Sequence, residues 1–259
     1  PDKIINIKNN KIIEDNFNKK KIIKQNILNY LNKLFKNFKV TSPKELPRMS
    51  SMLVGYFSYD IIRLIEKIPN SCRDDINIPD IRLMRPKNLI IYDNFKSKIF
   101  FIENIFEDQK IEDYQIEYNK IGNNLKELSH YGNIPLPTNF YRPAKKINIK
   151  SNITKSRFKK IVRKAKTYIG KGDIFQVVLS QRFKANINKP PLEIYNSLRK
   201  LNPSPFMFYF NYDDFQILGS SPEILVRLRN NEVTIRPIAG TRPRGKNNKE
   251  DKKYEIDLL

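Results

Sequence analysis

Apolar residues recur along the chain at two spacings, and these spacings predict its helices and strands. Positions three to four residues apart share one face of a helix, whereas alternate positions share one face of a strand. Helical spacing recurs four times and predicts helices over 23–38, 111–128, 154–170 and 190–203. Between the first two, a strand is predicted to run into a short helix that Pro69 ends.

Alternating apolar residues predict strands, which dominate the second half of the chain. The segment 173–183, DIFQVVLSQRF, predicts a strand with one apolar face and with Gln176 on its polar face. Two hairpins are predicted beyond it, turning at the Asp-Asp pair of YDDF and at the Asn-Asn pair of RNNE, and another is predicted over 88–104. Consecutive hairpins build antiparallel sheets, so the predicted fold class is α+β.

A proline-containing stretch interrupts the periodic segments near the middle of the chain. HYGNIPLPTNFYRPAKKINIK, residues 130–150, holds three prolines and shows neither helical nor strand spacing, which is typical of a connector. We therefore expect two domains, spanning residues 1–145 and 146–259. The second domain carries the two adjacent hairpins.

The charge of the chain raises a competing hypothesis about its function. The 259 residues carry a formal charge of +22, which on its own favours a polyanionic partner such as nucleic acid. The cations are mostly lysines, spread along the whole chain among asparagines and isoleucines, a pattern typical of an AT-rich gene. We therefore expect no nucleic-acid partner. A basic nucleic-acid-binding protein is the alternative, and it predicts DNA binding that weakens steeply with salt.

The scarcity of cysteine and histidine excludes several classes of site. Cys72 is the only cysteine and His130 the only histidine, so an intrachain disulfide, a His-based triad and a multi-histidine zinc site are excluded. No apolar run approaches the roughly 20 residues of a membrane span. The start, PDKIINIKNN, lacks the apolar stretch of a signal peptide. We expect a cytoplasmic protein without membrane association.

The register of the last predicted hairpin places an acid beside a glycine turn. If Asn230 and Asn231 are its two loop residues, counting outward places Glu223 opposite Ile238. The carboxylate of Glu223 would then lie beside the AGT turn, where a glycine frees backbone N–H groups and a threonine offers a hydroxyl. Such a site suits a small anionic substrate that needs an acid or a base.

Four motifs occur in a specific order: GDIFQVVLSQRF, NPSPFMFYF, LGSSPEILVR and RPIAGTRPRG. In this order and spacing they closely resemble the large-subunit (component I) family of anthranilate synthase, and LVGYFSYDIIRLIEKIP resembles its N-terminal region. The resemblance covers the chain from about residue 45 onward and implies layered antiparallel sheets with flanking helices, the chorismate-utilising fold. It also implies conversion of chorismate and ammonia to anthranilate and pyruvate, a step of tryptophan biosynthesis that uses Mg2+. A glutamine amidotransferase partner would supply the ammonia.

The resemblance implies roles for individual residues. Glu223 matches the family's acid, which protonates the departing C4 hydroxyl of chorismate; the alternative is a surface glutamate that caps a turn. Gly240 and Thr241 match the turn that contacts bound chorismate, with a purely structural turn as the alternative. Gln176 stands where isochorismate-forming relatives place a lysine that activates water. Because a neutral amide cannot take a proton from water, Gln176 favours ammonia as the nucleophile.

Ala239 separates two amination reactions. The aminodeoxychorismate synthases resemble this family but commonly place a nucleophilic lysine at the position of Ala239. An alanine cannot attack the ring, so the amine must be added directly, as anthranilate formation requires. Aminodeoxychorismate synthase component I is the alternative within the same superfamily.

Pro205, Phe206 and Met207 match a stretch that, in this family, helps to line a pocket for tryptophan, the feedback inhibitor. The alternative for this stretch is an aromatic-rich core strand. The family's other half of that pocket, a Leu-Leu-Glu-Ser motif, is not found here. We expect that it lies before Pro1 or that normal feedback control is lacking.

The resemblance also implies site residues that this sequence does not contain. The family's magnesium-binding glutamates, a histidine and a basic residue that grips the substrate carboxylate are expected downstream of Leu259, and no metal ligand is expected within the chain. We therefore expect a truncated catalytic domain with an exposed sheet edge, inactive alone, from a longer enzyme or a decaying gene. A non-catalytic remnant that still binds the amidotransferase or tryptophan is the alternative.

Overall fold

The computed structural model describes residues 1–17, 19–38, 40–106, 114–131, 147–236 and 240–258. The chain divides into two compact units, Pro1–Leu136 and Pro137–Leu259, each with its own sheets. The predicted domain boundary between residues 145 and 146 falls outside the described ranges and stays a prediction.

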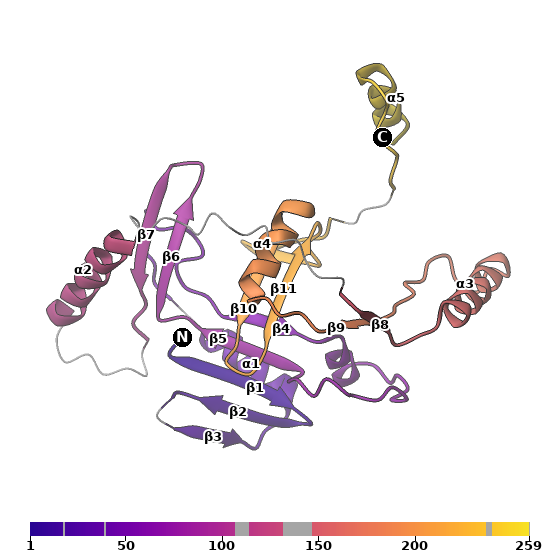
Figure 1. Cartoon of the computed structure of the whole chain (residues 1–259). Helices are drawn as coiled ribbons and strands as arrows, with labels where there is room; N and C mark the ends of the chain where they lie inside the picture. Colours follow the sequence, from indigo (N-terminus) through magenta and orange to yellow (C-terminus); the bar gives the residue numbers. More distant parts are fainter. Residues whose placement is uncertain (18, 39, 107–113, 132–146, 237–239, 259) are drawn as a thin grey trace. The chain divides into compact units, whose positions relative to one another are not determined.

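The first unit is built on a five-stranded antiparallel sheet with the strand order β3-β2-β1-β5-β4 (Figure 1). Its strands are β1 (Lys3–Lys8), β2 (Lys11–Asp15), β3 (Lys20–Ile23), β4 (Val54–Phe57) and β5 (Ile81–Arg85). β1 and β2 form a hairpin through Asn9 and Asn10, whose φ angles are 48° and 59°, a conformation that asparagine tolerates. β1, β2 and β3 are absent from the predicted elements, because lysines and asparagines interrupt their apolar alternation.

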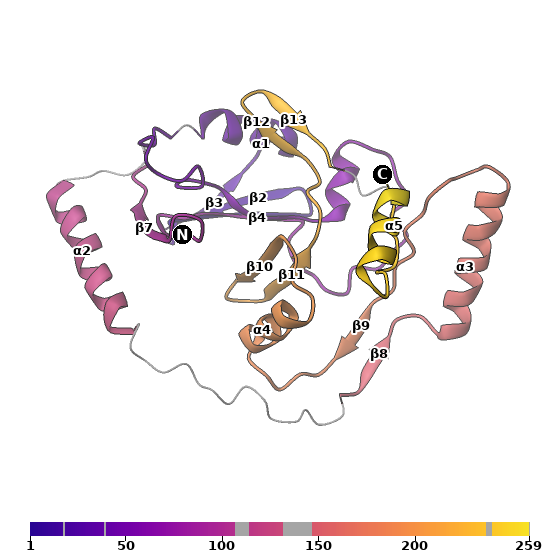
Figure 2. The same cartoon turned by 90° about the horizontal axis from the view of Figure 1, so that it is seen from above.

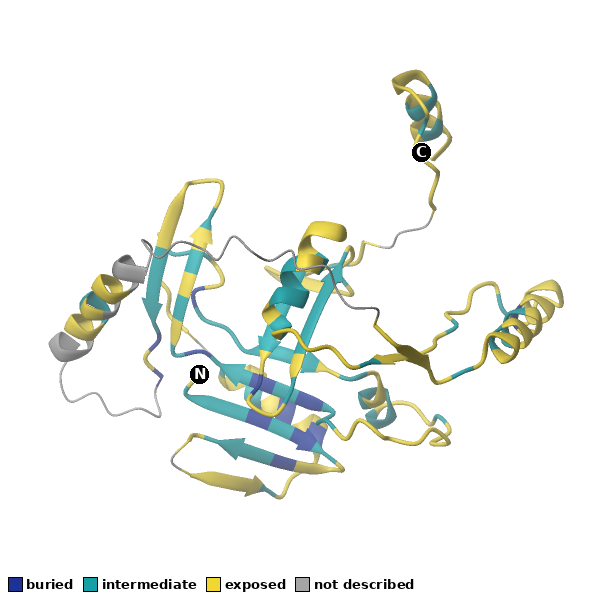
Figure 3. Ribbon diagram, viewed as in Figure 1, coloured by how far each residue is buried: buried dark blue, intermediate teal, exposed yellow. Residues whose placement is uncertain are grey.

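The core of the first unit lies between this sheet and helix α1 (Ile27–Asn37). Apolar residues of β1, β2 and β5 are buried with residues of α1, and Figure 3 shows the buried strand segments in dark blue. The buried cluster consists of Ile5, Ile7, Ile12, Ile27, Tyr30, Leu31, Ile81 and Leu83. The Asn26 side chain caps α1 by accepting from the Asn29 N–H (3.2 Å). The helix predicted over 23–38 is therefore confirmed from Ile27 onward, whereas Ile23 ends β3.

Tyr30 joins α1 to β2 through a hydrogen bond inside the core. Its hydroxyl donates to Glu14 Oε1 (2.6 Å), and its side chain is buried. Burial, followed by the hydrogen bond and the charge of Glu14, raises the pKa of the Tyr30 hydroxyl above its usual value. The hydroxyl therefore stays protonated at neutral pH, where it donates to the Glu14 carboxylate.

Tyr30→Phe is expected to lower the free energy of unfolding by about 1–2 kcal/mol, because the Glu14 carboxylate loses its donor while the ring keeps its packing. Urea denaturation of the two proteins measures the difference. Tyr92→Phe is the matched control, because Tyr92 is 58% exposed. An equal loss in both variants would show that the buried hydrogen bond contributes nothing.

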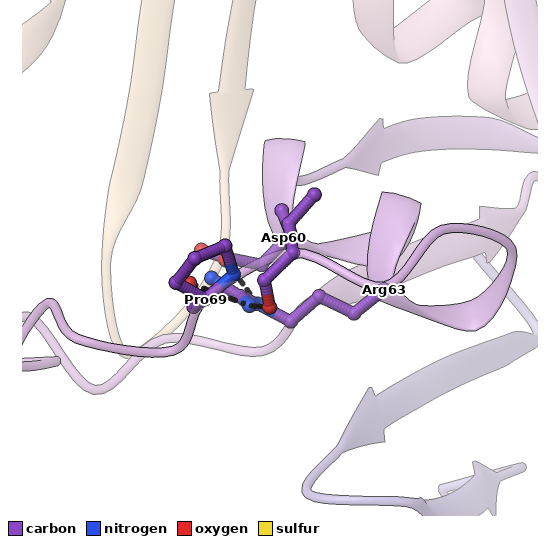
Figure 4. Close-up of polar contacts among 4 residues, drawn as sticks. Asp60, Arg63 and Pro69 are labelled. Carbon is purple, nitrogen blue, oxygen red and sulfur yellow. Dashed lines mark hydrogen bonds and ion pairs between the residues drawn. The ribbon is translucent and has the colours of Figure 1, made fainter.

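The side chain of Arg63 stabilises the segment that follows β4 through three hydrogen bonds (Figure 4). Its Nε donates to Asp60 Oδ1 (2.8 Å), and its Nη1 donates to the backbone carbonyls of Ile68 (3.0 Å) and Pro69 (3.1 Å). The predicted strand and short helix are confirmed, and the helix is a 3-10 helix over Tyr59–Leu64. The helix ends at Leu64, so the prediction that Pro69 ends it is wrong; the carbonyl of Pro69 is bound by Arg63.

The hairpin predicted over 88–104 and the helix after it are also confirmed. β6 (Asn88–Asp93) and β7 (Lys98–Glu103) pair antiparallel. In their turn, Asp93 Oδ1 accepts the N–H groups of Phe95 and Lys96 (both 3.0 Å). Helix α2 covers Tyr114–Tyr131, and the predicted helical positions 111–113 lie outside the described residues.

The second unit is a succession of helices and two-stranded sheets (Figures 1 and 2). Its elements are β8 (Ile149–Ser151), α3 (Lys155–Gly170), β9 (Phe183–Ala185), α4 (Pro191–Leu201), β10 (Phe206–Asn211), β11 (Gln216–Ser221), β12 (Arg227–Arg229), β13 (Glu232–Thr234) and α5 (Asn248–Leu258). β10 pairs with β11 and β12 with β13, which confirms both predicted hairpins. Every strand pair in the described part of the chain is antiparallel, which confirms the α+β class. No helix within the described ranges is long and apolar enough to cross a membrane.

The strand predicted over 173–183 is wrong for most of its length. Only Phe183–Ala185 forms a strand, β9, which pairs with β8. Among the described residues no neighbouring strand pairs with 173–182, and apolar alternation without ladder hydrogen bonds does not hold a chain extended. Phe175, predicted on the apolar face, consequently stays 93% exposed.

Candidate functional site

The end of strand β11 presents the motif LGSSPE, and the β10–β11 hairpin fixes the path of this motif. The hairpin turns at Asp213 and Asp214, as predicted, and its register pairs Phe208 with Gly219. A Cβ at position 219 would lie 2.3 Å from Cζ of Phe208, so a side chain here would displace the ring, whereas glycine lets it lie across the neighbouring strand. The glycine of LGSSPE thus lets an aromatic ring pack on the hairpin just before the acid.

Helix α4 holds the last residues of β11. The Ser220 hydroxyl donates to the carbonyl of Asn202, which follows the end of α4 (2.6 Å). The ring of Tyr195 on α4 lies 5.8 Å from the ring of Tyr209 on β10. These contacts connect the helix to both strands of the hairpin. Glu223 follows β11 as an exposed residue and is therefore presented from a packed helix–hairpin support.

Pro205, Phe206 and Met207, the predicted tryptophan-binding residues, lie at the start of β10 beside the acid motif. The register pairs Phe206 and Met207 with the two serines of SSPE, and the Ser221 hydroxyl donates to the carbonyl of Glu223 (3.2 Å). Pro205 and Phe206 are exposed, and Met207 is half-buried. The structure therefore brings these residues to the strand that leads into the acid, while their role in binding tryptophan stays a prediction.

The β12–β13 hairpin has the predicted turn and register. Asn230 and Asn231 both have positive φ (50° and 63°), and the strands pair as counted from this turn. Ile238 and Ala239 lie outside the described residues. The predicted position of Glu223 opposite Ile238 therefore stays a prediction, and so does the role of Ala239.

The glycine and threonine of the AGT turn begin a loop, residues 240–246, that folds against α5. The Gly245 N–H donates to Asp251 Oδ1 (2.8 Å), and the Lys246 N–H donates to Glu250 Oε2 (2.8 Å). Both acids lie in the first turn of α5, where the helix dipole also favours a carboxylate. The first turn of the helix thus receives the last two N–H groups of the loop.

Gly240 and Thr241, the predicted substrate-contacting residues, are exposed at the other end of this loop. A Cβ at position 240 would lie 3.3 Å from Cδ1 of Leu258, the last residue of α5. Arg242 forms an ion pair with Asp257, which is also near the end of the helix. The start of the loop therefore lies against the last turn of α5.

Asp251 is held in its charged form by the loop. The Gly245 N–H, and after it the Arg244 guanidinium (3.0 Å), lower the pKa of Asp251 below its ordinary value of 3.8. Because the pKa is lower in the folded chain, this contribution to stability is fully present above pH 3.8 and is lost as the pH falls through the lowered pKa. The contact between the loop and α5 is thus in place across the neutral range.

Gln176, the last of the predicted site residues, lies in the irregular segment 173–182 and is exposed. No hydrogen bond within the described residues joins it to Glu223, so their common site stays a prediction. The sequence analysis missed Glu250 and Asp251. The spacing from Asn247 to Glu250 could have indicated them, because an N-cap residue followed three positions later by a glutamate marks a helix start.

The magnesium that the resemblance implies has no fitting ligand set here. Within the described ranges, no group of three or more His, Cys, Asp or Glu side chains lies close enough together to hold a metal ion. The expectation that the ligands lie downstream of Leu259 stays a prediction.

A family model and curated relatives match this chain along most of its length. Residues 2–259 match the model of the chorismate binding enzyme family. Anthranilate synthase component 1 of Cereibacter sphaeroides is 41% identical over 235 residues, which cover 90% of this chain and 47% of that protein. The protein of the same name from Aquifex aeolicus is 42% identical over 233 residues, again 90% and 47%. The one from Acetivibrio thermocellus is 38% identical over 256 residues, which cover 97% of this chain and 52% of that protein.

A solved structure is similar over the whole chain. The crystal structure of anthranilate synthase component I from Streptococcus pneumoniae TIGR4 superposes with a TM-score of 0.80 and 30% sequence identity. The match covers 100% of this chain and 55% of that one. The chain thus spans about half the length of the relatives it matches.

Proposed function

The chain belongs to the family of chorismate binding enzymes, and on that premise we propose that it is the acid-bearing part of an anthranilate synthase large subunit, component I. The observation that carries the proposal is the placement of Glu223, exposed just after a strand whose path is fixed by Gly219 and by helix α4. An acid that projects from a packed support can reach a substrate bound beside it, which general acid catalysis requires. The names of the relatives, anthranilate synthase component 1, support the choice of reaction.

In the proposed reaction, chorismate and ammonia give anthranilate, pyruvate and water. The ammonia lone pair forms the new C–N bond on the ring, and the C4–O bond breaks with its electrons on the oxygen. Protonated Glu223 gives its proton to that oxygen, so the hydroxyl leaves as water, while the added amine loses a proton to solvent. The ring carbon that bears the amine then loses its proton to solvent as the bond from the ring to the enolpyruvyl oxygen breaks, which leaves the aromatic ring. The released enolpyruvate takes up a proton from solvent and becomes pyruvate. Gly240 and Thr241 contact the substrate during these steps.

Two uncharged side chains support amination by free ammonia. Gln176 has no basic group with which to activate water, so the nucleophile in this proposal is ammonia. Ala239 offers no amine that could form a covalent bond to the ring, so the nitrogen of the product comes from ammonia directly. Gln176 thus excludes activation of water by a basic side chain at its position, and Ala239 excludes a covalent bond between its side chain and the ring.

The proposal includes the surroundings that the resemblance implies. A glutamine amidotransferase supplies ammonia, Mg2+ would be bound by ligands downstream of Leu259, and tryptophan inhibits through the stretch 205–207. The enzyme works in the cytoplasm.

A chimera tests the proposed function: the 233 matching residues of this chain replace the corresponding 47% of the Aquifex aeolicus relative. With chorismate, Mg2+ and an ammonium salt, we expect anthranilate to form, followed by its fluorescence, and purified 1–259 serves as the reference. A product whose amine lies para to the carboxylate would indicate the aminodeoxychorismate alternative and contradict the proposal. A folded chimera that consumes no chorismate would contradict it as well.

A further inference from the structure

Loop 240–246 runs antiparallel to helix α5 and contacts it at both ends. Gly245 is bound by Asp251 in the first turn, whereas Arg242 pairs with Asp257 near the end of the helix. Five residues of extended chain reach about 17 Å, and a helix of 11 residues, such as α5, is about 16 Å long. The loop is therefore long enough to run the length of the helix.

The backbone contacts hold this loop more firmly than its ion pairs. The side chains of Arg242 and Arg244 are 41% and 92% exposed, so solvent screens their pairs with the acids of α5. Gly245 is half-buried, and a Cβ at this position would lie 2.1 Å from the backbone N of Asp251. The loop thus approaches α5 as closely as only a glycine permits, and a charged acceptor receives its N–H.

Held in this way, the loop leaves two polar side chains without a hydrogen bond or ion pair to the described residues, those of Thr241 and Lys246. The hydroxyl of Thr241 makes no hydrogen bond to any described residue, and Thr241 is exposed. Both arginines of the loop are instead paired with acids of α5. Lys246 lies at the opposite end of the loop, where its N–H is bound in the first turn of α5. At the predicted substrate-contacting end, the group that can meet a ligand is therefore the threonine hydroxyl.

From this geometry we infer that Asp251 is a positioning residue, which holds loop 240–246 against α5 so that Thr241 meets chorismate. The inference rests on the proposed function, because it takes chorismate as the ligand. The apparent dissociation constant equals the intrinsic one divided by the fraction of molecules in the binding conformation. A loop that is released from α5 most of the time therefore binds more weakly, although every substrate-contacting residue is still present.

Two variants release the loop by different routes. NMR of the full chain 1–259 measures amide exchange and chorismate binding in each of them. Asp251→Ala removes the acceptor, and Gly245→Ala forces the loop off the helix while leaving every residue of α5 intact. We expect faster hydrogen exchange of the amides of Gly245 and Lys246, the two that α5 binds, in both variants. We also expect the dissociation constant for chorismate, titrated on the amide shifts of Gly240 and Thr241, to rise about tenfold.

Glu255→Ala is the matched control, because it removes an acid from the same helix that contacts no described residue. Its exchange rates and chorismate affinity should equal those of the parent chain. Released amides in both variants with unchanged chorismate affinity would overturn the inference, and so would unchanged exchange rates. Absence of any chorismate-dependent shift in the parent would also overturn it for this chain, whereas the proposed function is judged separately by the anthranilate assay of the chimera.

Discussion

Ile12→Ala should lower the free energy of unfolding of the N-terminal sheet by about 3 kcal/mol. Ile12 has no solvent exposure, and on β2 it pairs with Ile7 of β1 on one side and with Ile23 of β3 on the other. The truncation removes three buried carbons, so the favourable free energy of their transfer from water into the core is lost. It also leaves a cavity that the sheet and α1 cannot fill completely. The loss is a large fraction of the stability of an ordinary domain.

Ile22→Ala is the matched control for this prediction. Ile22 lies on β3 and is 65% exposed, so the same truncation should change the stability by less than about 0.5 kcal/mol. Urea unfolding, followed by hydrogen–deuterium exchange of peptides from β1 and β2, isolates the first unit from the second. Equal losses in the two variants would show that the cluster around Ile12 is not the core of this unit.

The predictable parts of the fold are those that a few consecutive residues determine. Asn230 and Asn231 tolerate the positive φ that a tight turn needs, so the sequence alone predicted both the turn and the register of β12–β13. The same holds for the β10–β11 hairpin and for helix α4, where spacing and flanking prolines sufficed. Local patterns were sufficient for these elements, but not for the neighbouring strands β1, β2 and β3, whose apolar alternation is interrupted.

Prediction failed where distant residues decide the structure. The segment 173–182 alternates as a strand should, but a strand needs neighbours, and none pairs with it among the described residues. Conversely, β1 is extended because β5, more than 70 residues away, pairs with it, as in the pair of Ile7 with Ile81. Its own lysines and asparagines gave only a weak alternation.

The candidate site also combines features that neighbouring residues determine, which could be predicted, with features that depend on distant residues, which could not. The motif LGSSPE identified Glu223 from the sequence, and the structure adds why its glycine is needed, because the Phe208 ring lies on it. The arginines of TRPRG are paired with acids of α5. That pairing depends on how a loop folds back on a helix, which spacing along the chain does not reveal.

Glu223→Gln is expected to lower kcat for anthranilate formation at least about 100-fold in the chimera, with little change in KM. The amide has the shape of the acid and can still contact the substrate, but it has no proton to give to the departing C4 hydroxyl. An interaction made mainly in the transition state affects kcat, whereas uniform binding affects KM. Steady-state kinetics with ammonia, followed by anthranilate fluorescence, measures both constants.

Glu232→Gln provides the control for this substitution, because Glu232 is an exposed carboxylate of the same unit at the turn of β12–β13. It removes the same charge, so an effect of net charge or of handling would appear in both variants. We expect its kcat to stay within about twofold of the parent, as for most surface substitutions. If Glu223→Gln also stayed within that range, the acid would be a surface residue that follows β11, and the proton for the leaving hydroxyl would have to come from another group. A 100-fold loss confined to Glu223→Gln would instead assign the proton transfer to this residue.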